Sequence, residues 1–387
     1  MTEKKPFWDI FCTVIDNYGD IGVTWRLARQ LQQEHQRHVR LWIDDLTSFQ
    51  RLCPSLDPSL AVQMIDQILI CRWDPHFPTD FHPGEVIIEA FACELPTAVQ
   101  DTMRHMDKPP IWLNLEYLTA EDWIEGCHGL PSQQQGLTKF FFFPGFSKKS
   151  GGLLCESTLF EQRQQWQQNP THREWFCQQR GLLPPRPQEL FISLFSYENA
   201  ALPALISQWQ QSKTPIRCLV PQGRSLNSLQ SIFQDMPRNA GARWQQDALI
   251  LEILPMTDQH GYDELLWSCD FNIVRGEDSF LRAQWAARPF LWHIYPQEEN
   301  AHLEKLAAFL TLYTAQYPAE LADSVKSLFF AFNHENQDEW PEIWPEIQKK
   351  WNIWQNETQS WPEKALAGGN LANQLVQFVE KQLECSA

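Results

Sequence analysis

Two successive series of short apolar runs, separated by segments with helical patterns, constrain the fold of this chain more than any other feature. The first series consists of 8-WDIFCTVI-15, 38-HVRLWI-43, 85-EVIIEAF-91, 111-IWLNLEYL-118 and 139-KFFFFPGF-146. The second consists of 190-LFISLFSY-197, 216-IRCLVPQG-223, 248-ALILEILP-255, 270-DFNIVRG-276 and 289-PFLWHIYP-296. Continuous apolar runs of this length are typical of parallel strands buried on both faces. The sequence therefore predicts two doubly wound α/β domains.

A proline-rich stretch, 180-RGLLPPRPQE-189, separates the two series and has the composition of a linker. With 387 residues the chain is also long for a single hydrophobic core. We therefore expect one domain at 1–184 and a second at 185–360. The segment 361–387 is expected to form a helix that returns to the first domain, by analogy with two-domain enzymes of this architecture.

Composition excludes several classes of function. A formal net charge of −17 makes nucleic acid an unfavourable partner, because phosphate binding needs clustered Lys and Arg. The 10 cysteines form no CxxC pair, so the sequence predicts no zinc site. No apolar run approaches the roughly 20 residues of a membrane span, and the stretch MTEKKPFWDIF has no signal-peptide core. We expect a cytoplasmic protein without a membrane or nucleic-acid partner.

The first candidate site is 15-IDNYGDIG-22, which follows the first apolar run and opens a predicted helix. Ligands of doubly wound domains bind at the carboxyl ends of the strands, where this stretch lies. Its glycines allow a tight turn, although the full GxGxxG fingerprint is absent. Asp20 alone is explained equally well as a helix cap or as a catalytic carboxylate. Asp16 and Asp20 together favour catalysis, because two close carboxylates repel unless they share a cation or a proton.

The second candidate site is 275-RGEDSF-280, after the fourth run of the second series. Arg275 and Ser279 are donors suited to phosphate oxygens, at the start of a predicted helix. Glu277 and Asp278 are unusual next to phosphate, unless they bind sugar hydroxyls or turn their backbone amides toward the ligand. The alternative is an Asp-Ser helix start with Arg275 paired to Glu277 on the surface.

Aromatic residues follow two other strands of the second series, where Phe195, Tyr197 and Tyr295 could sandwich a nucleobase. Each of them alone is better explained by packing in the core or at its rim. No P-loop, D-x-D triplet or GxSxG elbow is present. What remains favours a metal-free enzyme that uses carboxylates and a nucleotide-sugar ligand.

Four motifs together identify a family. The combination of 15-IDNYGDIGVTWRLARQL-31, 112-WLNLEYLTAEDW-123, 140-FFFFPGF-146 and 275-RGEDSF-280 resembles the bacterial elongation factor P arginine rhamnosyltransferases, the EarP family. The resemblance implies a GT-B fold, in which two Rossmann-like domains face a central cleft. It implies an inverting, metal-independent glycosyltransferase without a cofactor, which moves L-rhamnose from dTDP-β-L-rhamnose to an arginine of elongation factor P. It also implies that the modified factor supports translation of polyproline stretches.

The resemblance also assigns residues. It implies that the first domain faces the acceptor protein and that the second domain binds the donor. The catalytic positions fall on Asp16, Asp20 and Glu277; the donor-binding positions fall on Phe195, Tyr197, Gln259, Arg275, Asp278, Ser279 and Tyr295; and the loop of the acceptor cleft falls on Asn17, Tyr18 and Gly19. In 252-EILPMTDQ-259, Met256 stands where an aromatic residue is expected, which reduces the rings available to the base.

The chemistry of the acceptor explains why two acids are needed. An arginine guanidinium is protonated at cellular pH, and its lone pairs are delocalised. One carboxylate can accept a proton while the other orients the cation; we assign Asp20 as the base and Asp16 as its partner, with the reverse assignment open. Two rival hypotheses remain from the sequence: a nucleotide-sugar oxidoreductase or epimerase, and a non-catalytic module that binds a translation factor.

Overall fold

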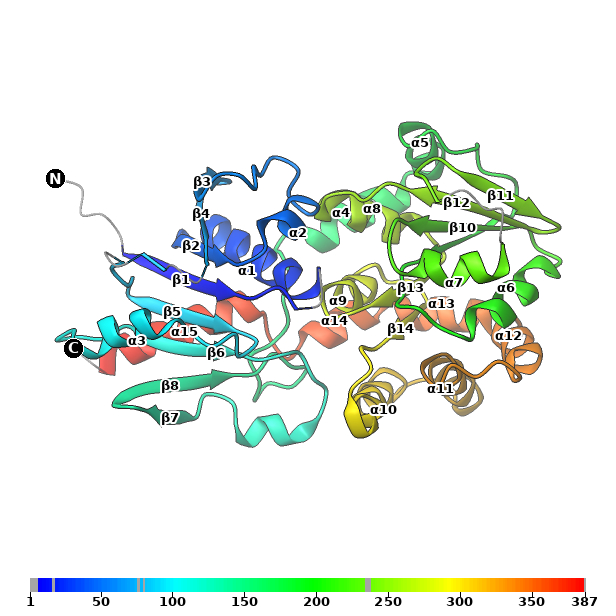
Figure 1. Cartoon of the computed structure of the whole chain (residues 1–387). Coiled ribbons are helices and arrows are strands. Elements are labelled where there is room, and N and C mark those ends of the chain that lie inside the picture. The colour runs from blue at the N-terminus through cyan, green and yellow to red at the C-terminus, as the bar shows by residue number, and fades with distance from the viewer. Residues whose placement is uncertain (1–5, 16–17, 75–76, 79–80, 234–237, 386–387) are drawn as a thin grey trace. The chain divides into compact units, whose positions relative to one another are not determined.

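A computed structural model describes residues 6–15, 18–74, 77–78, 81–233 and 238–385. The chain forms two compact units (Figure 1). Unit 1 contains residues Met1–Ser157 and Lys364–Ala387, and unit 2 contains Thr158–Glu363.

Unit 1 is built on an eight-stranded sheet in the order β3-β4-β2-β1-β5-β6-β8-β7. Its strands are β1 (Phe7–Cys12), β2 (His38–Ile43), β3 (Val62–Ile65), β4 (Ile68–Arg72), β5 (Val86–Ala90), β6 (Ile111–Leu115), β7 (Pro131–Gln134) and β8 (Leu137–Phe142). The edge strands β3 and β7 pair antiparallel with β4 and β8, and all the other pairs are parallel. The chain winds outward from β1 in one direction through β2 and β4, and then in the other through β5, β6 and β8.

The helices of unit 1 lie between these strands and at the end of the chain. They are α1 (Gly19–His35), α2 (Leu46–Gln50), α3 (Thr97–Arg104), the 3-10 helix η1 (Asp122–Gly126) and α15 (Leu371–Cys385). The last helix packs through Phe378, whose ring lies 5.4 Å from Phe140 and 5.7 Å from Phe142. The structure thus places residues 364–387 with unit 1.

Unit 2 contains a six-stranded sheet in the order β11-β12-β10-β9-β13-β14. Its strands are β9 (Leu190–Leu194), β10 (Ile216–Pro221), β11 (Arg243–Gln246), β12 (Leu249–Leu254), β13 (Phe271–Arg275) and β14 (Phe290–His293). Among the described strands of this sheet, the edge strand β11 alone pairs antiparallel. Winding again reverses at one position, between β9 and β13. Every predicted apolar run overlaps a strand, and the prediction of two doubly wound units is confirmed.

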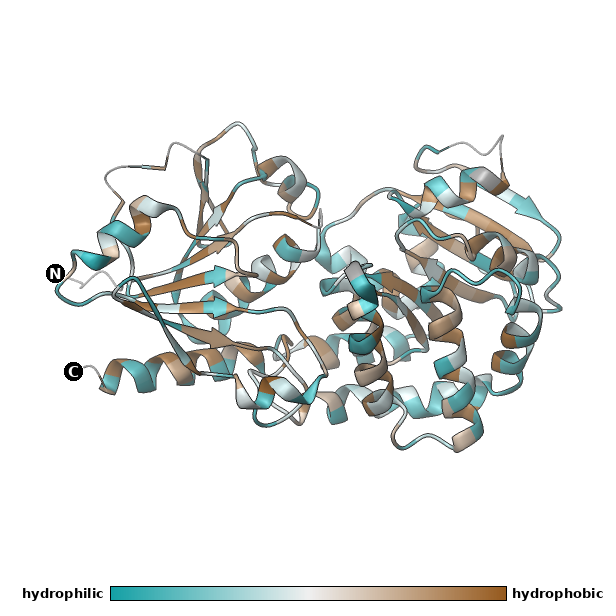
Figure 2. Cartoon of the chain, turned by 60° about the horizontal axis from the view of Figure 1, so that its bottom comes forward, coloured by the Kyte–Doolittle hydropathy of each residue, from teal (hydrophilic) through white to brown (hydrophobic). Residues whose placement is uncertain are grey.

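Helices cover the sheet of unit 2 and follow it in the chain. They are α4 (Leu159–Gln168), α5 (His172–Gln179), α6 (Leu202–Gln210), α7 (Ser225–Ile232), α8 (Gln259–Ser268), α9 (Asp278–Trp285), the 3-10 helix η2 (Glu298–Asn300), α10 (Ala301–Tyr313), α11 (Ala319–Asn333), α12 (Trp340–Lys349), α13 (Trp351–Gln359) and the first half of α14 (Trp361–Leu366), whose second half belongs to unit 1. The central strands of both sheets are largely hydrophobic, whereas the helices carry both colours of Figure 2. The helices of the second half bury Trp340, Trp344 and Trp354, so packing explains these tryptophans.

The boundary between the units lies earlier than the predicted position at 184/185, because α4 and α5 belong to unit 2. Trp166 of α4 donates its indole N–H to Oγ of Ser268 at 3.0 Å, and Arg173 of α5 donates to the carbonyl oxygen of the same residue at 2.9 Å. Both contacts fix these helices to α8. The predicted linker is therefore an internal segment of unit 2.

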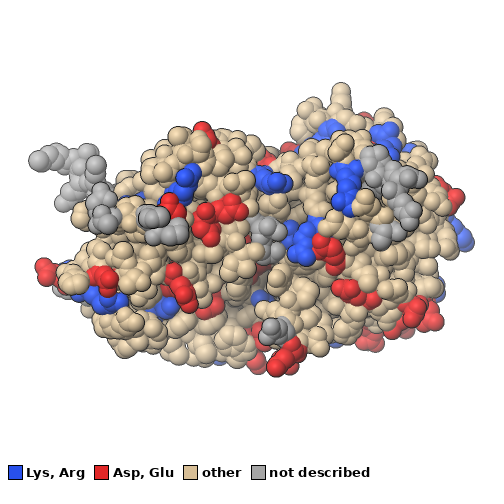
Figure 3. All heavy atoms as spheres, viewed as in Figure 1, with Lys and Arg blue, Asp and Glu red and all other residues tan. Residues whose placement is uncertain are grey.

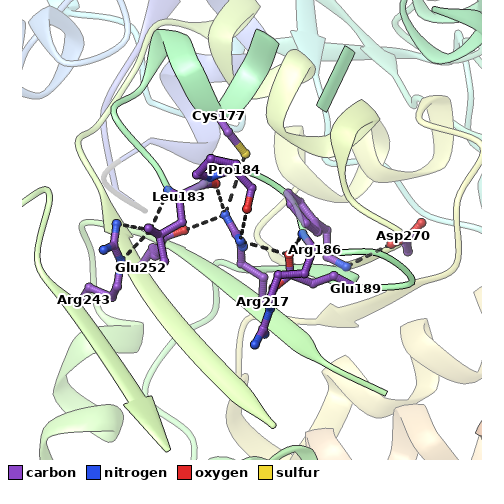
Figure 4. Close-up of polar contacts among 10 residues, drawn as sticks. Cys177, Leu183, Pro184, Arg186, Glu189, Arg217, Arg243, Glu252 and Asp270 are labelled. Atoms are coloured by element: carbon purple, nitrogen blue, oxygen red, sulfur yellow. Dashed lines mark hydrogen bonds and ion pairs between the residues drawn. The ribbon is translucent and has the colours of Figure 1, made fainter. Parts of the chain in front are cut away.

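A buried ion-pair network explains why the proline-rich stretch stays on unit 2 (Figure 4). Arg217 of β10 is fully buried and pairs with Glu189 at 2.9 Å and with Glu252 at 3.3 Å. The same guanidinium donates to the carbonyl oxygens of Leu183 and Pro184. Since a buried charge requires several such partners, the backbone of residues 183–184 is held against the sheet.

Candidate active site

The sheet of unit 1 has its topological switch point at β1 and β5, where loops of opposite winding diverge. Ligand sites of doubly wound sheets lie at the carboxyl ends of such strands. The segments after β1, β5 and β6 therefore define the candidate site of this unit.

Asp20 lies in the first turn of α1 and is 2% exposed. Its Oδ2 accepts a hydrogen bond from the backbone N–H of Ile15 at 3.0 Å, and its Oδ1 accepts one from the hydroxyl of Tyr117 at 3.0 Å. A negative charge at this position also interacts favourably with the N-terminal end of the 17-residue helix. These contacts orient a buried carboxylate with both of its oxygens engaged.

Tyr117 follows β6 and stacks on Phe91, which follows β5, with ring centroids 4.4 Å apart and an interplanar angle of 17°. Phe91 is buried, whereas Tyr117 is 39% exposed. Phe91 and Ala92 have positive φ values of 56° and 53°, a backbone conformation that is unfavourable outside glycine. The loop after β5 thus provides a fixed aromatic face for the tyrosine that contacts Asp20. No role was predicted for Tyr117 from the sequence, although this residue lies in 112-WLNLEYLTAEDW-123, one of the motifs that carry the family resemblance.

The other predicted residues of this stretch are placed only in part. Asp16 and Asn17 lie outside the described residues. Tyr18 directly precedes α1, and Gly19 is its first residue. Gly19 and Gly22 belong to the helix and have no positive φ, so no tight turn of their own is present there.

Unit 2 has its switch point at β9 and β13, and this position brings together most of the predicted donor residues. Arg275, the last residue of β13, is 3% exposed. Its guanidinium carbon lies 4.8 Å from the ring centre of Phe195 and 4.6 Å from that of Tyr197, the two aromatic residues after β9. Both rings are buried. In this structure they therefore contact Arg275 and hold its guanidinium at the strand end.

The segment from Gly276 to Ser279 turns from β13 into α9. Gly276 has a φ of 63°, and its carbonyl oxygen accepts a hydrogen bond from the indole of Trp292 at 2.9 Å. Glu277 and Asp278 are half-buried, and Ser279 is 9% exposed in the first turn of the helix. The backbone N–H groups of a helix start are suited to an oxyanion.

A buried ion pair fixes α9 to α8. Arg282 donates from Nε and from a terminal nitrogen to the two carboxylate oxygens of Asp263, at 2.8 and 2.7 Å. Both residues are buried. Because a two-pronged arginine–carboxylate pair is geometrically specific, the start of α9 is held in place against the neighbouring helix.

Residues after β14 complete this side of the sheet. The ring of Tyr295 lies 5.5 Å from that of Tyr197 and is 49% exposed, so it is the accessible aromatic residue of the predicted group. His293 lies 5.3 Å from Tyr197 on the buried side. Burial, with a further effect of Arg275, lowers the pKa of His293 to about 3. His293 is therefore neutral at physiological pH.

Gln259, also predicted as a donor contact, is buried as the first residue of α8.

A cavity of about 360 Å³ opens at the carboxyl ends of β10 and β12. Its wall includes Pro221, Leu254, Met256 and the side of α8 at Gly261. Trp175 of α5 contributes an indole that is 44% exposed. Met256, which the sequence analysis identified as unusual, therefore lines a partly apolar cavity.

The distribution of charge, of metal-binding side chains and of apolar helices was compared with what nucleic-acid, metal and membrane binding would need. On the face drawn in Figure 3, basic and acidic side chains lie in small groups, and the coloured atoms form no continuous basic surface. Among the described residues, no three His, Cys, Asp or Glu side chains cluster in a way that could hold a metal ion. The helices that the structure describes include none with the length and apolar character needed to cross a membrane.

Comparisons with known proteins identify the family. Residues 8–380 match the family model described as elongation factor P (EF-P) rhamnosyltransferase EarP. The protein-arginine rhamnosyltransferase of Shewanella oneidensis is 49% identical over 98% of this chain and 99% of its own length, and that of Pseudomonas aeruginosa is 47% identical over 96% and 98%. A solved EarP structure, reported as the basis for arginine glycosylation of translation elongation factor EF-P, matches with a TM-score of 0.70 and 34% identity over 97% of this chain and 99% of that chain.

These findings confirm the resemblance inferred from the four sequence motifs and, with the two doubly wound units, the predicted GT-B fold class. The order of the motifs along the chain is explained by the same match, which spans both units. The chain belongs to the EarP family of elongation factor P rhamnosyltransferases.

Proposed function

We propose that this chain transfers L-rhamnose from dTDP-β-L-rhamnose to one arginine side chain of elongation factor P, with inversion at the anomeric carbon and without a metal ion. Its membership in a family of protein-arginine rhamnosyltransferases supports the reaction class and the acceptor. The same proposal includes a role for the modified factor in the translation of polyproline stretches.

The observation that carries the proposal is the carboxylate of Asp20, which is buried and oriented through both oxygens. A guanidinium nitrogen attacks poorly because its lone pair is delocalised. A fixed carboxylate localises the positive charge and accepts the proton that the attacking nitrogen loses. Asp16, which stands four positions before Asp20 in the sequence, is proposed to orient the same guanidinium.

The donor is proposed to bind along the carboxyl edge of the unit 2 sheet. Arg275 and the start of α9 at Asp278 and Ser279 are suited to the diphosphate. The cavity lined by Met256 and Trp175 is suited to the base, because it offers apolar and aromatic surface next to the strand ends. Tyr295 and Glu277 are proposed to contact the sugar.

The proposed reaction is a single displacement. A terminal nitrogen of the acceptor arginine forms a bond to the anomeric carbon while the bond from that carbon to the diphosphate oxygen breaks. The proton of the attacking nitrogen passes to Asp20, and the electron pair of the broken bond leaves with dTDP. Arg275 and the backbone N–H groups of α9 stabilise the charge that grows on the leaving diphosphate. Because dTDP departs as a stable anion, no general acid is required.

The test is the intact mass of purified elongation factor P after incubation with this protein, dTDP-β-L-rhamnose and a metal chelator. We expect a gain of one deoxyhexose, located by fragmentation on an arginine and absent when that arginine is replaced by lysine. Proton–carbon couplings of the glycosylated arginine then report the anomeric configuration. No gain in mass would contradict the proposal, and a gain with retained configuration would contradict the single displacement.

A further inference from the structure

A second cavity of unit 2, of about 550 Å³, is lined by polar side chains and lies away from the proposed donor residues. Its wall comes from α4, α13, the start of α14 and the segment between α9 and β14. The donor-side residues Asp278 and Ser279 begin α9, whereas this cavity lies beyond the end of that helix at Arg288. The two sites therefore lie at opposite ends of one helix.

Two arginines give this cavity its positive charge. Arg163 of α4 is 4% exposed and donates to the carbonyl oxygen of Trp285 at 3.0 Å. Arg288 is partly buried, and its Nε is enclosed without a hydrogen-bond partner in the described part of the chain. Burial lowers the pKa of the Arg288 guanidinium from its usual value. Asp270, the acid that opposes this effect, is already ion-paired with Arg173.

Amide side chains supply acceptors on the same wall. Gln167 donates through Nε2 to the carbonyl oxygen of Ala286 at 3.0 Å, and Gln359 donates to that of Ala287 at 2.8 Å. Because the amide nitrogens point to the backbone at the end of α9, the amide oxygens are left as acceptors. Glu363 adds an exposed carboxylate to the rim.

We infer that this cavity binds a small oxyanion that carries hydroxyl groups, such as a sugar phosphate or a sugar acid. The guanidinium of Arg288 receives the oxyanion, for which arginine has the matching planar donor geometry. The oxygens of Gln167 and Gln359 accept from hydroxyl groups of the same molecule. A neutral sugar would bring no counter-charge to this partly buried guanidinium, which is less favourable.

The residues that line the cavity lie close in sequence to both points at which the chain crosses from one unit to the other. The helix α4 begins at residue 159, just after the boundary at 157/158, and Glu363 is the last residue before the chain returns to unit 1. A ligand held between α4 and α13 therefore contacts the two segments through which the units are linked covalently. The inference concerns binding at this site and does not depend on the donor assignment.

The experiment is titration calorimetry of the full chain with glucose 1-phosphate, gluconate and glucose. We expect one of the two anions to bind and glucose to bind at least about tenfold more weakly, since a charge-assisted contact is lost. The tighter anion identifies the source of the oxyanion as a phosphate ester or a carboxylate. Arg288→Gln should lower the affinity for that anion by about 10- to 100-fold. Arg238→Gln, which removes an exposed guanidinium of the same unit, should leave its affinity unchanged.

Two further results decide between this site and its alternatives. Arg275→Gln should retain anion binding, because Arg275 belongs to the donor side. In anion-free buffer Arg288→Gln should melt at the same temperature as the wild type or higher. The substitution removes a partly buried cation whose Nε has no hydrogen-bond partner among the described residues. Binding of neither anion, equal binding of glucose, wild-type affinity in Arg288→Gln, or loss of binding only in Arg275→Gln would each overturn the inference. A lower melting temperature of Arg288→Gln would identify a structural role instead.

Discussion

The hydroxyl of Tyr117 donates a hydrogen bond to Oδ1 of Asp20 at 3.0 Å, across 97 positions of the chain. The bond joins the segment after β6 to the first turn of α1, and Phe91 supports the tyrosine ring from the segment after β5. The carboxylate that we propose as the base is thus positioned by three adjacent parts of one sheet edge.

Tyr117→Phe tests this positioning. The substitution keeps the ring that stacks on Phe91 and removes only the hydroxyl, so the hydrogen bond to the carboxylate of Asp20 is lost. We expect turnover on elongation factor P to fall about tenfold, with KM for the donor unchanged, because donor residues lie on unit 2. Steady-state kinetics of the two substrates separate these effects, and an unchanged kcat would remove Tyr117 from the positioning of Asp20.

The buried network around Arg217 predicts a large effect on stability. Arg217→Ala leaves the buried carboxylates of Glu189 and Glu252 without their shared partner, and removing one member of such a network costs about 3–5 kcal/mol. Arg243→Ala is the matched control, because Arg243 also pairs with Glu252 but is 37% exposed. Its loss should change the free energy of unfolding by less than about 1 kcal/mol. Denaturant titrations of the two variants compare them, and similar midpoints would contradict this account.

The cavity beside Met256 predicts how the base is bound. Trp175→Ala should weaken dTDP binding by about 5- to 100-fold, if the indole stacks on the base. Affinity for inorganic pyrophosphate should not change, because that ligand lacks a base. Met256→Phe should strengthen dTDP binding by adding a ring to the same wall. Equal losses for dTDP and pyrophosphate in Trp175→Ala would place the base elsewhere.

His293 predicts a loss of stability on mild acidification. Its pKa is lowered to about 3 in the folded chain, against an ordinary value near 6.5. Below pH 6.5 the unfolded chain therefore binds a proton that the folded chain does not, so stability decreases as the pH falls. The contribution approaches about 1.4 kcal/mol per pH unit.

His293→Phe isolates this contribution, because the imidazole Nδ1 is buried without a hydrogen-bond partner in the described residues. The measurement is the free energy of unfolding between pH 6.5 and 5.5, before most carboxylates titrate. We expect a smaller slope in the variant, whatever its absolute stability. Parallel slopes for variant and wild type would show that His293 does not titrate as described.

The strands that the sequence predicted are those buried on both faces, because a continuous apolar run has no other common explanation. The strands that it missed include the edge strands β3, β7 and β11, whose exposed residues give no such run. The turn between β3 and β4 also lacks the usual signal, because Asp66 and Gln67 adopt positive φ there without a glycine.

The domain boundary could not be found from composition. Prolines at 184, 185 and 187 are typical of a linker. The partner that holds this segment, Arg217, lies 33 positions beyond Pro184 in the chain. In the candidate site, too, contacts between residues far apart in the sequence could not be predicted. Asp20 and Arg275 were found because each follows an apolar run, whereas the contacts of Tyr117 with Asp20 and of Arg275 with two rings depend on which strands are neighbours.

Asp20→Asn tests the central claim most directly, with Asp44→Asn as its matched control. Asp44 lies at the end of the neighbouring strand β2 and accepts a hydrogen bond from the backbone N–H of Val14 at 2.9 Å. We would measure the single-turnover rate of rhamnose transfer to elongation factor P, together with the affinity for dTDP. The account predicts that Asp20→Asn lowers the rate by about 10²–10⁴-fold with wild-type dTDP affinity, and that Asp44→Asn changes neither quantity by more than about threefold. A wild-type rate in Asp20→Asn would contradict it.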